Sequence, residues 1–201
     1  MEEKAFTLFV EAWNRIKEGY LFDESTNNTV DYMLKNLWKT KYNKIIKADI
    51  LKHFPAIYAH AKYSKNPPPL FYILISLRDN DIIKEMQSLL LIDWIKSNAS
   101  EDSTFQLLNF IETFSEKQIP IENFVNTIIK NMKPNFHADM LEAFAHMIVI
   151  HHPEFISNFI QKFLRFPDDT ILKNFIRMTG RVGMLKLIQI APPARLKKIV
   201  S

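Results

Sequence analysis

The residues best suited to acid–base or metal chemistry are His146, His151 and His152, which lie close together in the sequence beside Glu142 and Glu154. Histidine is the usual general base and a common metal ligand near neutral pH. Two ligands share a helical face when they are four residues apart, and a zinc site needs at least one more ligand from elsewhere. Glu142 and His146 have this spacing, but the adjacent His151 and His152 point apart. We interpret the cluster as a polar helix end and predict no metal site.

Nucleophilic and phosphate chemistry have no recognisable motif in this chain. There is no cysteine, which excludes disulfides and thiolate chemistry, and no Gly-x-Ser-x-Gly turn that would expose a serine nucleophile. The segment 177–184 contains Gly180 and Gly183, but it lacks the Gly-Lys-Ser/Thr ending of a phosphate-binding loop. Gly180 is better explained as the end of a helix. We therefore predict no catalytic residue and no cofactor, and expect the protein not to be an enzyme.

Basic side chains are concentrated in the last part of the sequence, where no Asp or Glu occurs after residue 169. Lys173, Arg177 and Arg181 are four residues apart and would form one stripe on a straight helix. The basic face that we predict comprises Lys173, Arg177, Arg181, Arg195, Lys197 and Lys198. Such a face is most often solvated or docks an acidic protein, and the alternatives are a nucleic acid or an anionic membrane surface.

Aromatic side chains supply the candidate contacts with a partner protein. Phe155, Phe159 and Phe163 run along one predicted helix together with further apolar residues, so its apolar arc is wider than one face. Such a helix is either enclosed within the fold or covered by another chain. Because buried aromatic residues carry most of the energy of interfaces, Phe155, Phe159, Phe163 and Trp94 are our candidate partner-binding residues.

The composition indicates that these residues are positioned by helices alone. Hydrophobic residues make up 47% of the 201 residues, which is typical of a globular protein. Only three glycines occur, whereas hairpin-rich β structure needs many residues with positive φ. Apolar residues recur three and four positions apart through most of the chain, which is the period of an amphipathic helix. We predict an all-α fold of stacked antiparallel helical hairpins, or an irregular helical bundle.

Polar and proline-rich segments mark the expected ends of the helices. We expect helices over residues 3–20, 30–38, 43–61 and 70–77, with a turn over 23–29, and a helix that begins at Asp79 or Asn80. Loops are predicted at 97–103 and around Pro120, Asn135, Pro153 and Pro167. The prolines of 67–69 are the clearest break. They divide the chain into an N-terminal helical cap, 1–66, and a repeat region, 67–201, that together form one continuous unit.

A repeated pattern occupies the second half of the chain. Three Leu-x-x-Phe pairs follow one another at intervals of 34 and 31 residues, and they are Leu107/Phe110, Leu141/Phe144 and Leu172/Phe175. A second apolar set, beginning at Phe124, recurs 32 residues later from Ile156. In these segments, about 102–190, the chain resembles HEAT or armadillo-type helical repeats in architecture. This resemblance implies a scaffold for binding proteins, less often one for nucleic acids, and the alternative is a bundle without repeats.

Our expectation for function is a non-enzymatic protein–protein interaction module. It would be an adaptor or assembly subunit, for example in a bacterial secretion apparatus or another multiprotein complex, and would bind a partner helix or peptide in an apolar groove. The alternative is a nucleic-acid-binding protein that uses the basic face. Apolar runs too short to cross a bilayer and an N-terminus unlike a secretory signal lead us to expect a soluble, cytoplasmic protein, able to form homo-oligomers.

Overall fold

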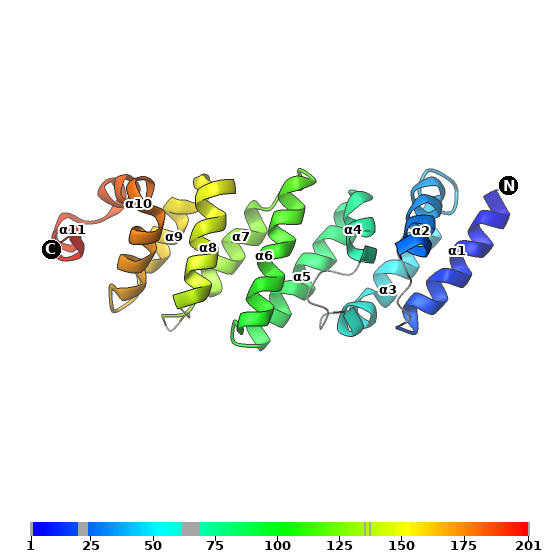
Figure 1. Ribbon diagram of the computed structural model, residues 1–201, viewed down its shortest axis with the longest axis horizontal. Coiled ribbons are helices and arrows are strands. Elements are labelled where there is room, and N and C mark those ends of the chain that lie inside the picture. Colours follow the sequence, from blue (N-terminus) through cyan, green and yellow to red (C-terminus); the bar gives the residue numbers. More distant parts are fainter. Residues whose placement is uncertain (1, 20–23, 62–68, 135, 137, 201) are drawn as a thin grey trace. The chain divides into compact units, whose positions relative to one another are not determined.

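The computed structural model describes residues 2–19, 24–61, 69–134, 136 and 138–200, and these residues are almost entirely helical (Figure 1). They form eleven α-helices and one short 3-10 helix, and none of them lies in a strand. The predicted all-α class is confirmed. In the described parts of the chain, no helix is both long enough and apolar enough to span a membrane.

Two compact units make up the chain, residues Met1–Asp93 and Trp94–Ser201. The boundary between them falls inside the helix α5 (Asn80–Lys96). The domain boundary that we predict at 66/67 lies outside the described residues and stays a prediction. Each unit has its own buried apolar residues, such as Leu34 and Phe71 in the first and Phe110 and Phe144 in the second.

The first unit contains four helices and most of α5. These four are α1 (Glu2–Lys17), α2 (Glu24–Leu37), α3 (Asn43–Ala61) and α4 (Pro69–Ser76). α1 packs against α2 and α3, and α2 packs against α4. The buried indole of Trp13 donates a 2.6 Å hydrogen bond to Oδ2 of Asp49, and Lys17 pairs with the same oxygen at 3.0 Å. A polar contact therefore fixes α1 on α3 at the edge of the apolar core.

Two helix starts in the first unit test the sequence-based boundaries. Oδ1 of Asp79 accepts hydrogen bonds from the backbone N–H groups of Asp81 and Ile82, as predicted for the N-terminus of α5. The predicted turn over 23–29 is wrong, because α2 already begins at Glu24. The hydroxyl of Thr29 does not cap a helix there. It bonds to the carbonyl of Ser25 one turn earlier, which a hydroxyl can do inside a helix.

The second unit is built from two rows of helices. α6 (Glu101–Glu116), α8 (Ala138–His151) and α10 (Thr170–Ile190) lie side by side in one row, and α7 (Glu122–Asn131) and α9 (Ile156–Phe163) form the other (Figure 1). The short helix η1 (Pro153–Phe155) leads into α9, and α11 (Pro193–Val200) packs against α10. The predicted loop over 97–103 is shorter in the structure, because α6 begins at Glu101.

The repeated Leu-x-x-Phe pairs occupy equivalent places in this unit. One pair lies on each of α6, α8 and α10, and all six side chains are at most 1% exposed. Hydrogen bonds also recur at the interval of the repeat. Asn158 donates to the side chain of Asn126, and Lys162 donates to the carbonyl of Lys130, each across 32 residues. The arrangement is compatible with a helical-repeat architecture.

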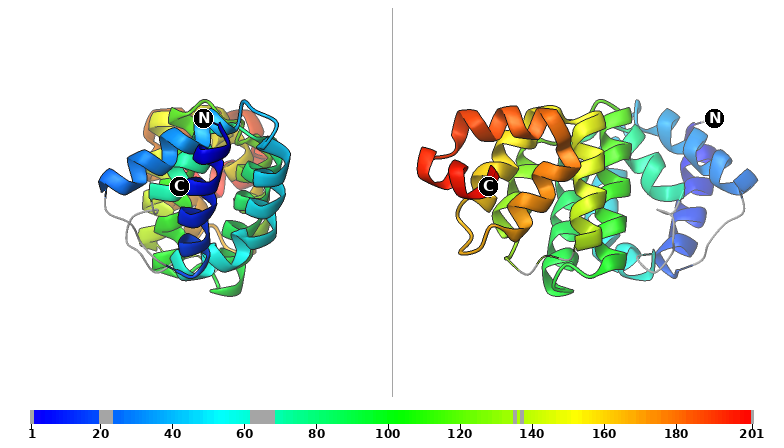
Figure 2. Two further views of the ribbon diagram at one scale, coloured as in Figure 1. Left: turned by 90° about the vertical axis from the view of Figure 1, so that its right-hand side faces the viewer. Right: turned by 60° about the vertical axis from the view of Figure 1, so that its left-hand side comes forward.

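A sharp bend divides α10 at Gly180, which has φ 58° and ψ −137° inside the helix (Figure 2). We predicted a helix end here, and the structure shows two helical halves joined directly at this residue. A side chain at this φ and ψ would strain the backbone, whereas glycine has no Cβ. Gly180 therefore sets the direction of the second half, residues 181–190.

We predict that Gly180→Ala lowers the free energy of unfolding by about 1–3 kcal/mol, because alanine is strained at this φ. Urea denaturation followed by circular dichroism measures the change. Asn174→Ala, on the regular first half of α10, is the matched control, and we expect it to change stability by less than about 0.5 kcal/mol. Equal effects of the two substitutions would show that the bend does not depend on glycine.

Candidate functional site

A groove of about 580 Å³ opens in the second unit beside the end of α5. We call it the Trp94 groove. Its apolar walls come from Trp94, Ile95, Met132, Phe136 and Met140. Its polar rim contains Asn98, Ser100, Glu101, Asn131 and Lys133.

An unusual turn after α5 shapes one side of this groove. Asn98 and Ala99 have φ values of 52° and 56°, a conformation that residues other than glycine rarely adopt. The backbone N–H of Ala99 donates a 2.8 Å hydrogen bond to the carbonyl of Trp94, which closes the end of the helix. Nζ of Lys133, from beyond α7, donates to Oδ1 of Asn98 at 3.3 Å. The rim is thus tied together by polar contacts.

The base of the groove is continuous with the aromatic core. The indole N–H of Trp94 donates a 3.0 Å hydrogen bond to the hydroxyl of Thr104, which holds the ring in place. The ring of the half-buried Phe136 lies 6.2 Å from that of Trp94 and 5.8 Å from that of Phe144. Phe136 was not singled out in the sequence, because it lies 42 residues from Trp94 and only folding brings the two rings together.

A second hollow, of about 870 Å³, lies between the α6–α7 turn and the start of α9. We call it the acidic cleft, because the carboxylates that line it are Glu112, Glu116, Glu122 and Glu154. At its side, Nε2 of His152 lies 2.6 Å from Oγ of Ser115, and Nδ1 lies 3.1 Å from Oε1 of Glu154. The predicted polar helix end is therefore a network that joins α6 to η1.

Carboxylate, imidazole and hydroxyl stand here in the order that serine hydrolases use. Acyl transfer also needs hydrogen-bond donors for the negative charge that develops beside the serine. The carboxylates around the acidic cleft oppose such a charge. The hydroxyl of Ser115 is in addition 2.7 Å from the carbonyl of Ile111 in its own helix, to which it donates. The network is better suited to holding the two helices together than to nucleophilic attack.

Two members of the predicted basic face have structural partners. Nε and Nη2 of Arg195 donate to Oδ1 of the buried Asp169 at 2.9 and 2.6 Å, and its guanidinium also donates to the carbonyls of Leu164 and Phe166. Lys198 lies 3.4 Å from Oδ2 of the same carboxylate. The hydrogen bonds from Arg195 lower the pKa of Asp169, while burial opposes this shift. These contacts fasten α11 to the segment that joins α9 to α10.

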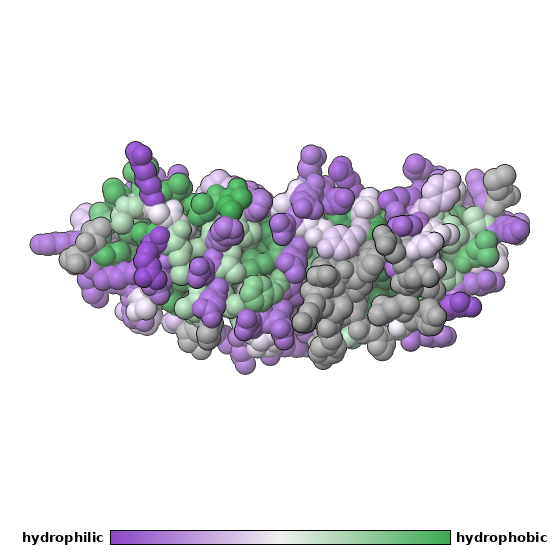
Figure 3. Space-filling view, in the orientation of Figure 1, coloured by the Kyte–Doolittle hydropathy of each residue, from purple (hydrophilic) through white to green (hydrophobic). Residues whose placement is uncertain are grey.

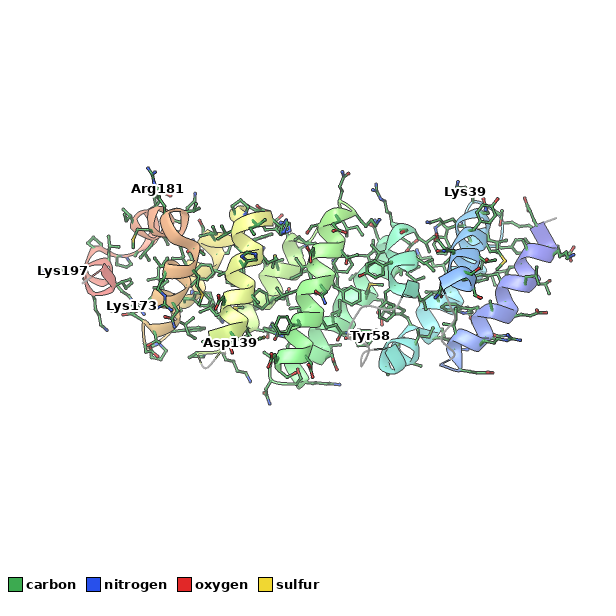
Figure 4. The ribbon with its side chains drawn as sticks, viewed as in Figure 1. Lys39, Tyr58, Asp139, Lys173, Arg181 and Lys197 are labelled. Atoms are coloured by element: carbon green, nitrogen blue, oxygen red, sulfur yellow. The ribbon has the colours of Figure 1, made fainter. Side chains whose placement is uncertain are left out.

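The other predicted cations are exposed on α10 and α11. They are Lys173, Arg177, Arg181 and Lys197. Figure 4 shows Arg181 projecting away from α10, and Lys197 on α11. The bend at Gly180 separates Lys173 and Arg177 from Arg181, so they do not form the single straight stripe that their spacing suggested.

The four candidate partner-binding residues lie in the core of the second unit. Trp94, Phe155, Phe159 and Phe163 are at most 5% exposed. Phe159 and Phe163 pack against the ring of Phe175 at 5.4 and 5.3 Å. The wide apolar arc left two alternatives, a helix enclosed within the fold or one covered by another chain. In the structure these rings are enclosed within the fold. Trp94 and Phe155 nevertheless form parts of the walls of the Trp94 groove and of the acidic cleft.

Comparison of the chain with protein-family models, with curated proteins and with solved structures gives no match. Among the residues that the structure describes, no three His, Asp or Glu side chains converge as metal ligands would.

We predict that Arg195→Ala lowers the free energy of unfolding by about 2–3 kcal/mol, because it leaves a buried carboxylate without its strongest donor. Thermal and urea denaturation measure the loss. Lys197→Ala removes a neighbouring exposed cation and serves as the control, with an expected effect below about 0.5 kcal/mol. Similar losses in the two variants would contradict a structural role for Arg195.

The Arg195–Asp169 pair should also make the free energy of unfolding depend on pH at acidic pH values. Because the pKa of Asp169 is lowered in the folded protein, the pair stabilises the fold above the ordinary Asp pKa of about 3.9. This stabilisation is lost as the pH falls through the lowered value. We expect wild type to be more stable than Asp169→Asn at pH 7, with the difference shrinking below about pH 4. A difference that stays constant down to pH 2 would contradict this assignment.

Proposed function

We propose that the protein is a non-enzymatic protein-interaction module with HEAT- or armadillo-like helical repeats, an adaptor or assembly subunit of a multiprotein complex. Its partner contributes a peptide or helix that inserts a large apolar side chain into the Trp94 groove. The observation that carries this proposal is the groove itself, where an apolar hollow meets a polar rim between helices.

The dimensions and the lining of the Trp94 groove suit a side chain of a partner. Its volume of about 580 Å³ lies within the range of about 300–1,000 Å³ that is usual for ligand sites. Met132 and Met140 contribute flexible thioether side chains, which adapt to differently shaped apolar groups. Ile95 is 43% exposed at the edge, so an inserted side chain would remove it from water.

The charged side chains on the rim of the groove would orient a bound partner. Glu101 and Lys133 bear opposite charges on the same rim, and both are exposed. Opposite charges at a rim affect the orientation of a partner and its rate of association more than its final affinity. Buried aromatic surface at the centre with charges around it is the usual anatomy of a protein–protein interface.

Nucleic-acid binding is the second candidate. It is favoured by the exposed cations Lys173, Arg177, Arg181 and Lys197, and by the lack of acidic residues after Asp169. The engagement of Arg195 by Asp169 removes this member of the predicted face from such a role. Binding of this kind would weaken steeply as the salt concentration rises, because it releases counterions from phosphates.

The test is capture of partners by the full chain from its native lysate at physiological salt, with and without nuclease. We expect defined proteins to be retained after nuclease treatment, and Ile95→Glu to reduce their recovery about tenfold, because it places a charge at the edge of the Trp94 groove. Ile150→Glu is the control, because it changes an isoleucine on α8 that is 55% exposed and lies outside the groove. This variant should capture the same proteins as the wild-type chain.

Two outcomes would overturn the proposal. Loss of all bound material with nuclease would favour nucleic-acid binding, which Arg177→Glu should then weaken. Equal recovery by Ile95→Glu and Ile150→Glu would show that the partner does not use the Trp94 groove.

A further inference from the structure

The second half of α10, residues 181–190, is apolar on two opposite sides. On one side, Gly183 and Leu187 are buried against the rest of the unit. On the other, Val182, Leu185 and Ile188 are 44%, 51% and 54% exposed. A spacing of three residues places these side chains along one helical face, which we call the α10 stripe. A helix with apolar residues on opposite sides normally lies between two layers.

Two cations border the α10 stripe. Arg181 lies at its start and Lys186 at its edge, and α10 contains no acidic residue. In Figure 3, apolar surface over α10 lies next to strongly hydrophilic side chains. Charges beside an apolar helical seam contribute to the choice of partner, and cations here favour a helix that carries carboxylates.

Three possible occupants differ in how well they suit this surface. A second copy of the chain, paired through the same stripe, would bring the cations of both copies together, which costs free energy. A membrane surface would gain little, because three partly exposed aliphatic side chains supply less apolar area than one acyl chain, and a single acyl chain binds only marginally. A helix with its own apolar seam and flanking carboxylates complements both the shape and the charge.

We propose that the α10 stripe is a second docking surface, which binds an acidic amphipathic helix of a partner protein. The partner helix places its apolar seam over Val182, Leu185 and Ile188. Its Glu or Asp side chains lie beside Arg181 and Lys186. Because the bend at Gly180 sets the direction of this half of α10, the same glycine positions the docking surface.

The probe for this surface is a fluorescently labelled, 21-residue helical peptide. Leucine occupies the positions along one face of its helix, and glutamate occupies the positions on both sides of that face. A second peptide carries lysine in place of every glutamate. Fluorescence anisotropy with the full chain at physiological salt measures binding. We expect the acidic peptide to bind at least about tenfold more tightly than the basic one, in keeping with charge selection.

Leu185→Glu is the decisive variant, because its side chain is half exposed and its replacement should not affect folding, which circular dichroism checks. We expect it to weaken binding of the acidic peptide about tenfold or more, as loss of a central apolar contact does. Ile150→Glu, which lies outside the α10 stripe, should bind like wild type. Ile95→Glu should also bind normally, so failure at the Trp94 groove and failure here are distinguishable.

Two results would overturn this proposal. The first is equal binding of the acidic and the basic peptide to the wild-type chain, and the second is unchanged binding of the acidic peptide to Leu185→Glu. A dimer in sedimentation equilibrium that Leu185→Glu dissociates would assign the surface to a second copy. Binding of phosphatidylserine vesicles or of a 20-base-pair DNA duplex, without binding of the acidic peptide, would assign it to a membrane or to a nucleic acid.

Discussion

The second unit depends on a continuous series of packed aromatic rings. Trp94, Phe136, Phe144, Phe159 and Phe175 follow one another with centroid separations of 5.4–6.2 Å, from the end of α5 to α10. Aromatic pairs at these separations add about 0.5–1.5 kcal/mol each to the stabilisation from burial. The rings come from α5, from the segment before α8, and from α8, α9 and α10, so loss of one ring would loosen the elements on both sides of it. The groove and the α10 stripe are therefore positioned by the same core.

Polar contacts then fix the ends of the helices that this core stacks. Lys162 donates to the last turn of α7, Arg195 to the carbonyls that follow α9, and Ser115 bonds with His152 between α6 and η1. Helix ends carry backbone groups without partners in the helix, so such contacts are needed wherever an end is shielded from water. Several residues whose types suggested chemistry or recognition are used in this way. Their roles are structural because of where the fold places them.

The Trp94 groove and the α10 stripe differ in form and in charge. The Trp94 groove is an apolar hollow with charges of both signs at its rim, whereas the α10 stripe is an exposed row of apolar side chains beside cations alone. A hollow suits an inserted side chain, whereas a row of side chains along a helix suits a second helix laid along it. The two docking surfaces that we propose would therefore select partners of different chemistry.

The amino-acid pattern alone determined most of the helices and their buried faces, because both depend on local spacing. Periodic apolar residues placed α3 correctly over Asn43–Ala61, and the Leu-x-x-Phe pairs identified the buried faces of α6, α8 and α10. The start of α2 was missed, because Ser, Thr and Asn favour caps yet are tolerated within a helix.

Tertiary structure alone decided which side chains remain available for function. Whether Phe155 and Phe159 face a partner or a neighbouring helix depends on what packs against them, and periodicity cannot show this. In the same way, Arg195 is engaged by Asp169, 26 residues earlier, and Trp94 meets Phe136 only after folding. Local spacing specifies the faces of a helix, whereas long-range packing determines which of those faces meets water.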